Sequence, residues 1–296
     1  MARKSFALLP LVLFFCWAPA TLPGQEAGLK QPSFDSDGVP IHYIVTGPDD
    51  GEPVVLIHGF AGSIEMQWGQ IIPDLKKDFK IIALDCRGHG GSGKPHDPAK
   101  YGVEMGNDVA RLLDHLKIDK ANVVGYSMGS GIALSFAVHH PRRVRTVTLG
   151  GSSGMNGREN ALILEVADSL EKGDGLGPLL IALTPKNQPK PTAQAIKFIN
   201  NAVFSFNDPK ALAAVARGAV GDEISETQVE AIKAPALSII GADDPLRADV
   251  ERLKTLLPAA RVVVIDKANH MTAYARPEFI AELRKFLNDH RQPPVK

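Results

Sequence analysis

Three polar residues that lie far apart in the chain have the types needed for nucleophilic catalysis: Ser127, Asp244 and His270. A serine hydroxyl becomes a useful nucleophile only when a base removes its proton. The base in turn needs a partner that fixes its tautomer and stabilises its charged form. We expect His270 to accept the proton of Ser127, with Asp244 or Asp243 behind the imidazole. Such a set predicts acyl transfer through a serine.

The sequence around Ser127 predicts a sharp turn between a strand and a helix. Gly-Tyr-Ser-Met-Gly occupies positions 125–129, after an aliphatic run at 121–124 and before an apolar helical pattern at 130–140. In a nucleophile elbow, the serine adopts a sparsely populated backbone conformation that pushes its hydroxyl clear of the sheet. The flanking glycines are needed because a Cβ at either position would collide with the neighbouring strand or helix.

A second Gly-x-Ser-x-Gly pattern occurs at positions 150–154, with Ser152 at its centre. It also follows a predicted strand, at 144–149. The residues that come next, Met-Asn-Gly at 155–157, are typical of a loop and not of an apolar helix. We therefore predict that Ser127, and not Ser152, is the nucleophile.

Composition limits the class of protein. The chain has 296 residues, of which 44% are hydrophobic and 22% charged, which is enough for one large domain with an ample core. Its formal net charge is zero, so no nucleic-acid-binding surface is expected. Of the two cysteines, Cys16 lies in the N-terminal apolar segment described below, and Cys86 is expected to be a buried, inert thiol.

Residues 1–20 are typical of a secretory signal peptide. Arg3 and Lys4 precede an apolar run at 6–17, and Ala-Pro-Ala at 18–20 fits a small-x-small cleavage site. A buried helix is the alternative. A membrane span is not expected, because the run is short and a proline interrupts it. The pattern predicts a secreted or periplasmic protein without stable membrane insertion, in which residues 21–33 form a linker.

Segments typical of strands and of helices alternate along most of the remaining chain. Continuous aliphatic runs predict strands that are covered on both faces, and periodic apolar positions predict helices. The predicted strands are 41–46, 53–57, 80–84, 121–125, 144–149, 236–240 and 261–265, preceded by a first strand near Phe34. The predicted helices are 65–77, 103–117, 128–139, 246–257 and 277–289. This alternation predicts an α/β fold with a mostly parallel, eight-stranded sheet flanked by helices.

The alternation is interrupted between positions 150 and 233. Helical patterns occur at 158–172, 192–204 and 209–220, without a convincing strand. Because regular parts of the sheet lie on both sides, we expect residues 151–232 to form an inserted helical lid. The core would then comprise residues 34–150 and 233–290, with a frayed tail at 291–296. The lid is mostly aliphatic, with Phe198, Phe204 and Phe206, which favours an apolar acyl or alkyl group in the substrate.

Several ordered motifs resemble those of the α/β-hydrolase superfamily, and of its lidded, esterase- or lipase-like serine hydrolases in particular. They are Leu-Ile-His-Gly-Phe at 56–60, Asp-Cys-Arg-Gly-His-Gly-Gly-Ser at 85–92, the serine turn at 125–129, Gly-Ala-Asp-Asp-Pro at 241–245, and His270. The resemblance covers residues 34–290. It implies that Ser127 is the nucleophile, His270 the base and Asp244 the third member, because the family carboxylate usually lies three residues after the glycine of its motif.

One position departs from the family pattern. Asn269 stands where the family usually has glycine before the catalytic histidine. Asparagine also tolerates left-handed backbone conformations, so the substitution is compatible with the same turn.

The resemblance also implies the remaining parts of the site. The backbone N–H groups of Phe60 and Met128 would stabilise the oxyanion, while His58 and His89 would be structural. It implies an enzyme without a metal or organic cofactor that hydrolyses a small or medium carboxylic ester through an acyl-enzyme. Cleavage of a C–C bond, a lactone or an amide, or perhydrolysis, remains open with the same triad. A non-catalytic ligand-binding protein on this fold is the alternative from another class.

Overall fold

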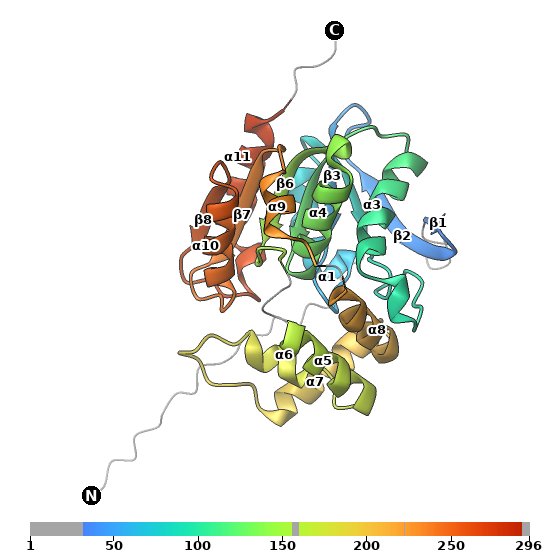
Figure 1. Cartoon of the computed structure of the whole chain (residues 1–296), viewed down its shortest axis with the longest axis vertical. Helices are drawn as coiled ribbons and strands as arrows, with labels where there is room; N and C mark the ends of the chain where they lie inside the picture. Colours follow the sequence, from blue (N-terminus) through green and yellow to red (C-terminus); the bar gives the residue numbers. More distant parts are fainter. Residues whose placement is uncertain (1–31, 156–159, 222, 292–296) are drawn as a thin grey trace, which may run out of the picture. The chain divides into compact units, whose positions relative to one another are not determined.

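The structure, a computed structural model, describes residues 32–155, 160–221 and 223–291 (Figure 1). The signal peptide predicted at 1–20, residues 21–31 of the predicted linker and residues 292–296 of the predicted tail lie outside the described residues. The strands are β1 Ser33–Ser36, β2 Val39–Thr46, β3 Glu52–Ile57, β4 Phe79–Leu84, β5 Ala121–Tyr126, β6 Val144–Gly150, β7 Ala236–Gly241 and β8 Arg261–Ile265.

The helices are α1 Ile64–Trp68, α2 Ile72–Leu75, α3 Val103–His115, α4 Met128–His139, α5 Asn160–Lys172, α6 Gly177–Ala182, α7 Ala193–Phe204, α8 Pro209–Ala219, α9 Glu226–Glu230, α10 Arg247–Leu256 and α11 Pro277–Asp289. Three short 3₁₀ turns, η1 Pro98–Lys100, η2 Pro141–Arg143 and η3 Ala273–Ala275, complete the described elements. Within this part of the chain, no helix has both the length and the apolar character needed to cross a membrane.

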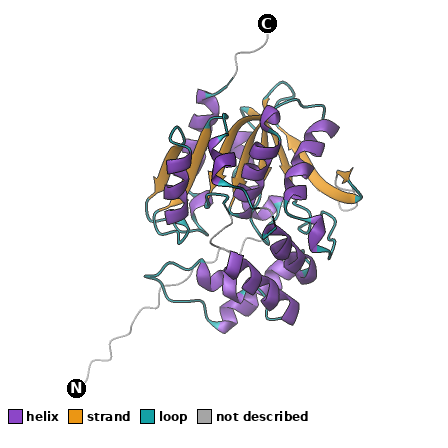
Figure 2. Ribbon diagram, in the orientation of Figure 1, coloured by secondary structure: helices purple, strands orange, loops and turns teal. Residues whose placement is uncertain are grey.

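The strands, drawn in orange in Figure 2, form one sheet. Their order in the sheet is β1-β2-β4-β3-β5-β6-β7-β8. Strand β2 pairs antiparallel with β1 and β4, and all other neighbours are parallel. The predicted eight-stranded, mostly parallel sheet is therefore confirmed. Ile57 pairs with Gly125, and Gly150 pairs with Tyr126 and Ile239, so the carboxyl ends of β3, β5, β6 and β7 meet at one edge. Ligands of open α/β sheets bind at this edge.

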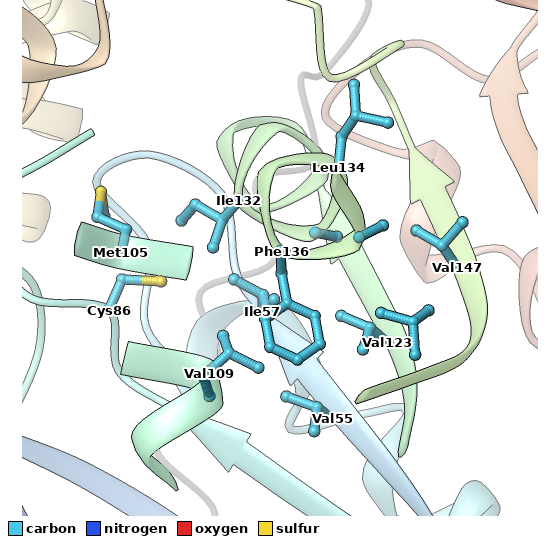
Figure 3. Close-up of a cluster of buried hydrophobic side chains, with 14 of the residues drawn as sticks. Val55, Ile57, Cys86, Met105, Val109, Val123, Ile132, Leu134, Phe136 and Val147 are labelled. Atoms are coloured by element: carbon cyan, nitrogen blue, oxygen red, sulfur yellow. The ribbon is translucent and has the colours of Figure 1, made fainter. Parts of the chain in front are cut away.

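Helices cover both faces of the sheet, as the continuous aliphatic strands predict. Figure 3 shows Val55, Ile57 and Val123 facing side chains of α3 and α4, among them Val109 and Phe136. The intervening residues of β3, Val54 and Leu56, belong to a second core with α1, α2 and α11. Successive side chains of a strand point to opposite faces, so two cores of aliphatic side chains fix its position.

The region between β3 and β4 differs from the prediction of one helix over 65–77. Helix α1 ends at Trp68, and α2 starts again at Ile72 with Pro73 in its first turn. Proline has no N–H to donate to the carbonyl of Gly69, so a continuous helix would lose a hydrogen bond and clash at this point. The prediction of one uninterrupted helix was wrong.

Residues 160–230 contain α5 to α9, and no strand among those that the structure describes. Helices α5 to α8 enclose an apolar cluster of their own, which includes Val166, Leu170 and Leu212. Helix α9 does not pack with this cluster. Val229, in α9, and Ile232, just after it, are buried in the core that contains α3 and α4. We refer to α5 to α8 as the helical insertion.

Candidate active site

Ser127 occupies a strained turn between β5 and α4. Its φ of 55° and ψ of −118° lie in a region that a side chain rarely adopts, at a cost of about 1–3 kcal/mol. A Cβ on Gly125 would lie 1.9 Å from the carbonyl oxygen of Gly129, and one on Gly129 would lie 2.2 Å from that of Ile57. Only glycine fits at these two positions, which agrees with the predicted nucleophile elbow.

His270 lies between Ser127 and Asp244. Its Nε2 is 2.9 Å from Ser127 Oγ, and its Nδ1 is 2.9 Å from Asp244 Oδ2. The histidine and aspartate side chains are almost fully buried, with exposed fractions of 4% and 0%. Because an ionised carboxylate can only accept, Nδ1–H donates to Asp244, and Nε2 is left to accept from the serine hydroxyl. The arrangement can therefore move a proton away from Ser127.

The two neighbouring aspartates have different environments. The other carboxylate oxygen of Asp244, Oδ1, accepts from the backbone N–H of Leu246 at 2.9 Å. Asp243 is exposed, and its backbone N–H donates to the carbonyl oxygen of Ala268 at 2.9 Å. Of the two candidates that the sequence leaves open, the structure places Asp244 against His270.

The two predicted oxyanion donors flank Ser127. Met128 is the first residue of α4, and Gly59, which precedes Phe60, lies directly against the turn. A Cβ on Gly59 would be 3.3 Å from the Cβ of Ser127 and 3.3 Å from the carbonyl oxygen of Tyr126. Within the described residues, the backbone N–H groups of Phe60 and Met128 have no acceptor. Two N–H groups beside a nucleophile are suited to a developing oxyanion.

Comparison with known proteins agrees with the fold that positions these residues. A family model described as the alpha/beta hydrolase fold matches residues 52–169, which contain β3 to β6, the loop of Phe60 and the turn of Ser127. The chain has the α/β-hydrolase fold. Several proteins that resemble it carry the names of hydrolases, and this α/β hydrolase is accordingly an enzyme.

Individual relatives of this α/β hydrolase carry names for different reactions. "Putative 2-succinyl-6-hydroxy-2,4-cyclohexadiene-1-carboxylate synthase" of Bacillus subtilis (strain 168) is 29% identical over 84% of this chain and 94% of that protein. The structure of Est816, titled an N-acyl homoserine lactone degrading enzyme, is 29% identical, with a TM-score of 0.70 over 86% of this chain and 100% of that one. A thermophilic esterase from Thermogutta terrifontis is 25% identical, with a TM-score of 0.74 over 89% and 99%.

The buried histidines of this α/β hydrolase hold loops together. His58 Nδ1–H donates to the carbonyl oxygen of Gly59 at 2.8 Å, and its Nε2 accepts from the backbone N–H of Cys86 at 2.9 Å. His89 Nδ1–H donates to the carbonyl oxygen of Arg87 at 3.0 Å. Burial lowers the pKa of His58, and it lowers the pKa of His89 to about 3, so both rings are neutral near pH 7. These contacts are those of structural residues.

Cys86 and Ser152, which the sequence also singled out, are not hydrogen-bonded to Ser127, His270 or Asp244. Burial raises the pKa of the Cys86 thiol well above its usual value, which keeps it protonated. Ser152 Oγ accepts from the backbone N–H of Gly154 at 3.1 Å, and no described histidine is hydrogen-bonded to it.

Asn269 does not use the left-handed conformation that would explain its place in the sequence. Its Oδ1 accepts from the backbone N–H of Met271 at 3.0 Å and from Thr272 Oγ1 at 3.1 Å. The residue with a positive φ in this loop is Lys267, at 55°. The asparagine therefore stabilises the turn after His270 through its side chain, and the explanation from left-handed backbone was wrong.

Two supporting residues were missed in the sequence. The hydroxyl of Tyr126 donates to the carbonyl oxygen of His270 at 2.6 Å, which holds the histidine loop against β5. The side-chain amide of Asn207 bonds to the backbone of Ala61 and Gly90. For Tyr126 the sequence offers no signal, because its place inside the serine motif accepts many residue types. Asn-Asp-Pro at 207–209 indicates a helix start, which explains Asp208 but not Asn207.

Proposed function

We propose that this α/β hydrolase cleaves a small or medium carboxylic ester through an acyl-enzyme on Ser127. The observation that carries the proposal is the continuous pair of 2.9 Å hydrogen bonds from Asp244 through His270 to Ser127. Two further observations support it: the N–H groups of Phe60 and Met128 beside the serine have no acceptor among the described residues, and the chain is similar to a thermophilic esterase.

Acylation begins when Ser127 Oγ attacks the carbonyl carbon of the ester and His270 Nε2 takes the hydroxyl proton. The π electrons of the carbonyl move to its oxygen, and the N–H groups of Phe60 and Met128 bind the resulting oxyanion. As the tetrahedral intermediate collapses, the bond to the leaving oxygen breaks, and His270 gives its proton to the departing alcohol. Asp244 stabilises the imidazolium between these two steps.

Deacylation repeats the sequence with water as the nucleophile. His270 removes a proton from water, whose oxygen attacks the acyl carbonyl carbon, and the second intermediate uses the same two N–H donors. Collapse breaks the bond to Ser127 Oγ, which recovers its proton from His270. One ester and one water molecule thus give one carboxylic acid and one alcohol.

Hydrolysis of a p-nitrophenyl ester tests the proposal. We expect Ser127→Ala to lower kcat by about 10,000-fold or more, because the nucleophile is lost. The matched variant Ser152→Ala, in the second Gly-x-Ser-x-Gly pattern, should retain kcat within about twofold. A fluorophosphonate probe should label Ser127 and leave Ser152 free. Full activity in Ser127→Ala, or a folded wild-type protein that binds a small ligand but is never labelled, would contradict the assignment.

A lactone is the second candidate substrate. The observation in its favour is the 29% identity to Est816, titled an N-acyl homoserine lactone degrading enzyme, over 86% of this chain. A lactone is a cyclic ester, so the same steps open its ring and the leaving alcohol stays attached to the acid. A panel of linear esters, lactones and diketones, compared by kcat/KM, separates these classes and also tests C–C cleavage.

The helical insertion and the N-terminal segment carry two further parts of this proposal. We propose that α5 to α8 form a lid whose aliphatic side chains select an apolar acyl group, so kcat/KM should rise with acyl length in the ester panel.

We also propose that residues 1–20 direct secretion or export to the periplasm. Amino-terminal sequencing of the exported protein should then begin at Thr21, and an intact Met1 would contradict export by this signal.

A further inference from the structure

The side chain of Asn207 joins the helical insertion to two loops of the core. Asn207 lies between α7 and α8 and is only 5% exposed. Its Nδ2 donates to the carbonyl oxygen of Ala61 at 3.0 Å, and its Oδ1 accepts from the backbone N–H of Gly90 at 3.0 Å. The side-chain amide thus donates a hydrogen bond to one loop of the core and accepts a hydrogen bond from the other. This pairing fixes the orientation of the side chain.

The loop held by Nδ2 carries one of the two oxyanion donors. Gly62 N–H donates to the carbonyl oxygen of Gly59 at 3.1 Å, so Phe60 and Ala61 are the central residues of a tight turn. Ala61 has a φ of 60°, which glycine adopts readily and alanine rarely adopts. Such a conformation persists only where surrounding contacts impose it. The hydrogen bond from Asn207 to the Ala61 carbonyl is one such contact.

The methyl group of Ala61 provides a second contact with the insertion. Ala61 is buried in the apolar cluster of α5 to α8, together with Val166, Val203 and Leu212. Among the described residues, it is the one buried member of this cluster that comes from outside the insertion, and the partly buried Phe60 packs against the cluster. The insertion therefore contacts the same turn through a hydrogen bond and through apolar packing.

We propose that Asn207 is a positioning residue for the oxyanion hole. By holding the carbonyl of Ala61, it fixes the turn at 59–62 so that the N–H of Phe60 is directed at the oxygen that becomes charged above Ser127. Asn207 itself touches neither the substrate nor the reacting atoms. The inference rests on the proposed acyl-transfer function, and it makes the alignment of one oxyanion donor depend on the docking of the helical insertion.

The variant Asn207→Asp tests this role because it keeps the size of the side chain and removes the donor. A carboxylate oxygen would then face the carbonyl oxygen of Ala61, and the turn would lose its anchor. The oxyanion forms only along the reaction path, so a displaced donor lowers kcat and leaves KM almost unchanged. We expect kcat to fall by about 10- to 100-fold, as for a displacement near 1 Å, and KM to stay within about twofold.

A pair of inhibitors separates positioning from general destabilisation. An alkyl trifluoromethyl ketone forms a tetrahedral adduct with the serine, whose oxyanion needs the N–H donors, whereas the corresponding methyl ketone binds mainly through the pocket. In Asn207→Asp, affinity for the trifluoromethyl ketone should fall by the same factor as kcat. Affinity for the methyl ketone should not change. A merely structural role would not alter the ratio of the two affinities.

Asn200→Asp is the matched control. Asn200 Oδ1 accepts from the backbone N–H of Leu176 at 3.0 Å and its Nδ2 donates to the carbonyl oxygen of Asp174 at 3.4 Å. Both partners lie between α5 and the start of α6, and neither is hydrogen-bonded to the turn at 59–62. This variant should lower the thermal stability of the insertion. The ratio of its affinities for the two ketones should be that of the wild type.

Asn207→Ala is the second test variant, for the case in which Asn207→Asp does not fold. It loses both hydrogen bonds without introducing a charge. We expect the same fall in kcat and the same fall in affinity for the trifluoromethyl ketone relative to the methyl ketone. Folded Asn207 variants with the kcat and the affinity ratio of the wild type would overturn the inference. An equal change of the affinity ratio in Asn200→Asp would overturn it as well. Failure of the proposed function would look different, because wild-type activity would then survive Ser127→Ala.

Discussion

Asp244 orients the imidazole of His270 through one of its two carboxylate oxygens. One carboxylate oxygen of Asp244 bonds to His270 Nδ1 and the other to the backbone N–H of Leu246, each at 2.9 Å. On the other side, Tyr126 holds the backbone carbonyl of His270 at 2.6 Å. The ring is thereby fixed by its own side chain and by its backbone, and Nε2 is directed at Ser127.

Exchange of the carboxylate for an amide should disturb the tautomer of His270. In Asp244→Asn, the side-chain NH₂ can donate to Nδ1, which would place the imidazole proton on Nε2, facing Ser127. The base could then no longer accept the serine proton, and we expect kcat for a p-nitrophenyl ester to fall by about 10,000-fold. Asp243→Asn, one position earlier and exposed, should keep kcat within about twofold. Equal losses in both variants would contradict the assignment of Asp244.

The residues of the proton path could be predicted to different degrees. Ser127 and His270 follow from motif and order, since each comes after a recognisable strand. Asp244 is distinguished from Asp243 only by the family spacing, because both follow the same strand end. Asn207 could not be predicted, since its partner Ala61 lies 146 residues away and the contact depends on how a helix junction docks on a turn.

At the scale of elements, strands were easier to predict than short helices. A buried strand such as β5 is a continuous aliphatic run, whereas α6 has six residues and α9 five, too few for a clear helical period. The sequence does contain a pattern that marks the start of α9. Ser225 and Gln228 form a capping box, a pattern of Ser followed three residues later by Gln that marks a helix start. For α1 and α2, Pro73 was the signal for the break.

The elbow between β5 and α4 allows a test of element packing through Gly129→Ala. Alanine favours a helix over glycine by about 1 kcal/mol. At this position, however, its Cβ would lie 2.2 Å from the carbonyl oxygen of Ile57, which belongs to the backbone of a central strand. We expect the clash to dominate and to lower the free energy of unfolding by about 1–3 kcal/mol in urea denaturation. The displaced turn should also lower kcat.

Gly177→Ala, in the first turn of α6, is the control for this substitution. The nearest atoms to its new Cβ would be 3.8 Å away, an ordinary contact. The free energy of unfolding should therefore stay within about 1 kcal/mol of wild type or rise slightly. If Gly129→Ala proved equally harmless, the close approach of α4 to β3 would not be what requires glycine at the elbow.

At the scale of the whole molecule, a buried ion pair connects segments that the sheet alone does not join. Arg87 Nε donates to Asp108 Oδ2 at 2.6 Å, and both side chains are 1% exposed. Ser36, at the end of β1, donates to Asp108 Oδ1 at 2.5 Å, and Arg87 Nη1 donates to the carbonyl oxygen of Lys100 at 2.6 Å. The pair thus links β1, α3, η1 and the loop after β4, which also carries Gly90, the second partner of Asn207.

Removal of one partner of this pair should destabilise the entire domain. In Asp108→Ala, the guanidinium of Arg87 would stay buried without its counter-charge, and we expect the free energy of unfolding to fall by about 3–5 kcal/mol. Asp114→Ala removes the carboxylate of an exposed pair, in which Asp114 lies 2.7 Å from Arg143 and is 66% exposed. It should cost no more than about 1 kcal/mol. Urea denaturation of the two variants measures both values. Similar small losses would show that Arg87 finds water or another partner when Asp108 is absent, and that packing of the sheet and helices alone holds these segments together.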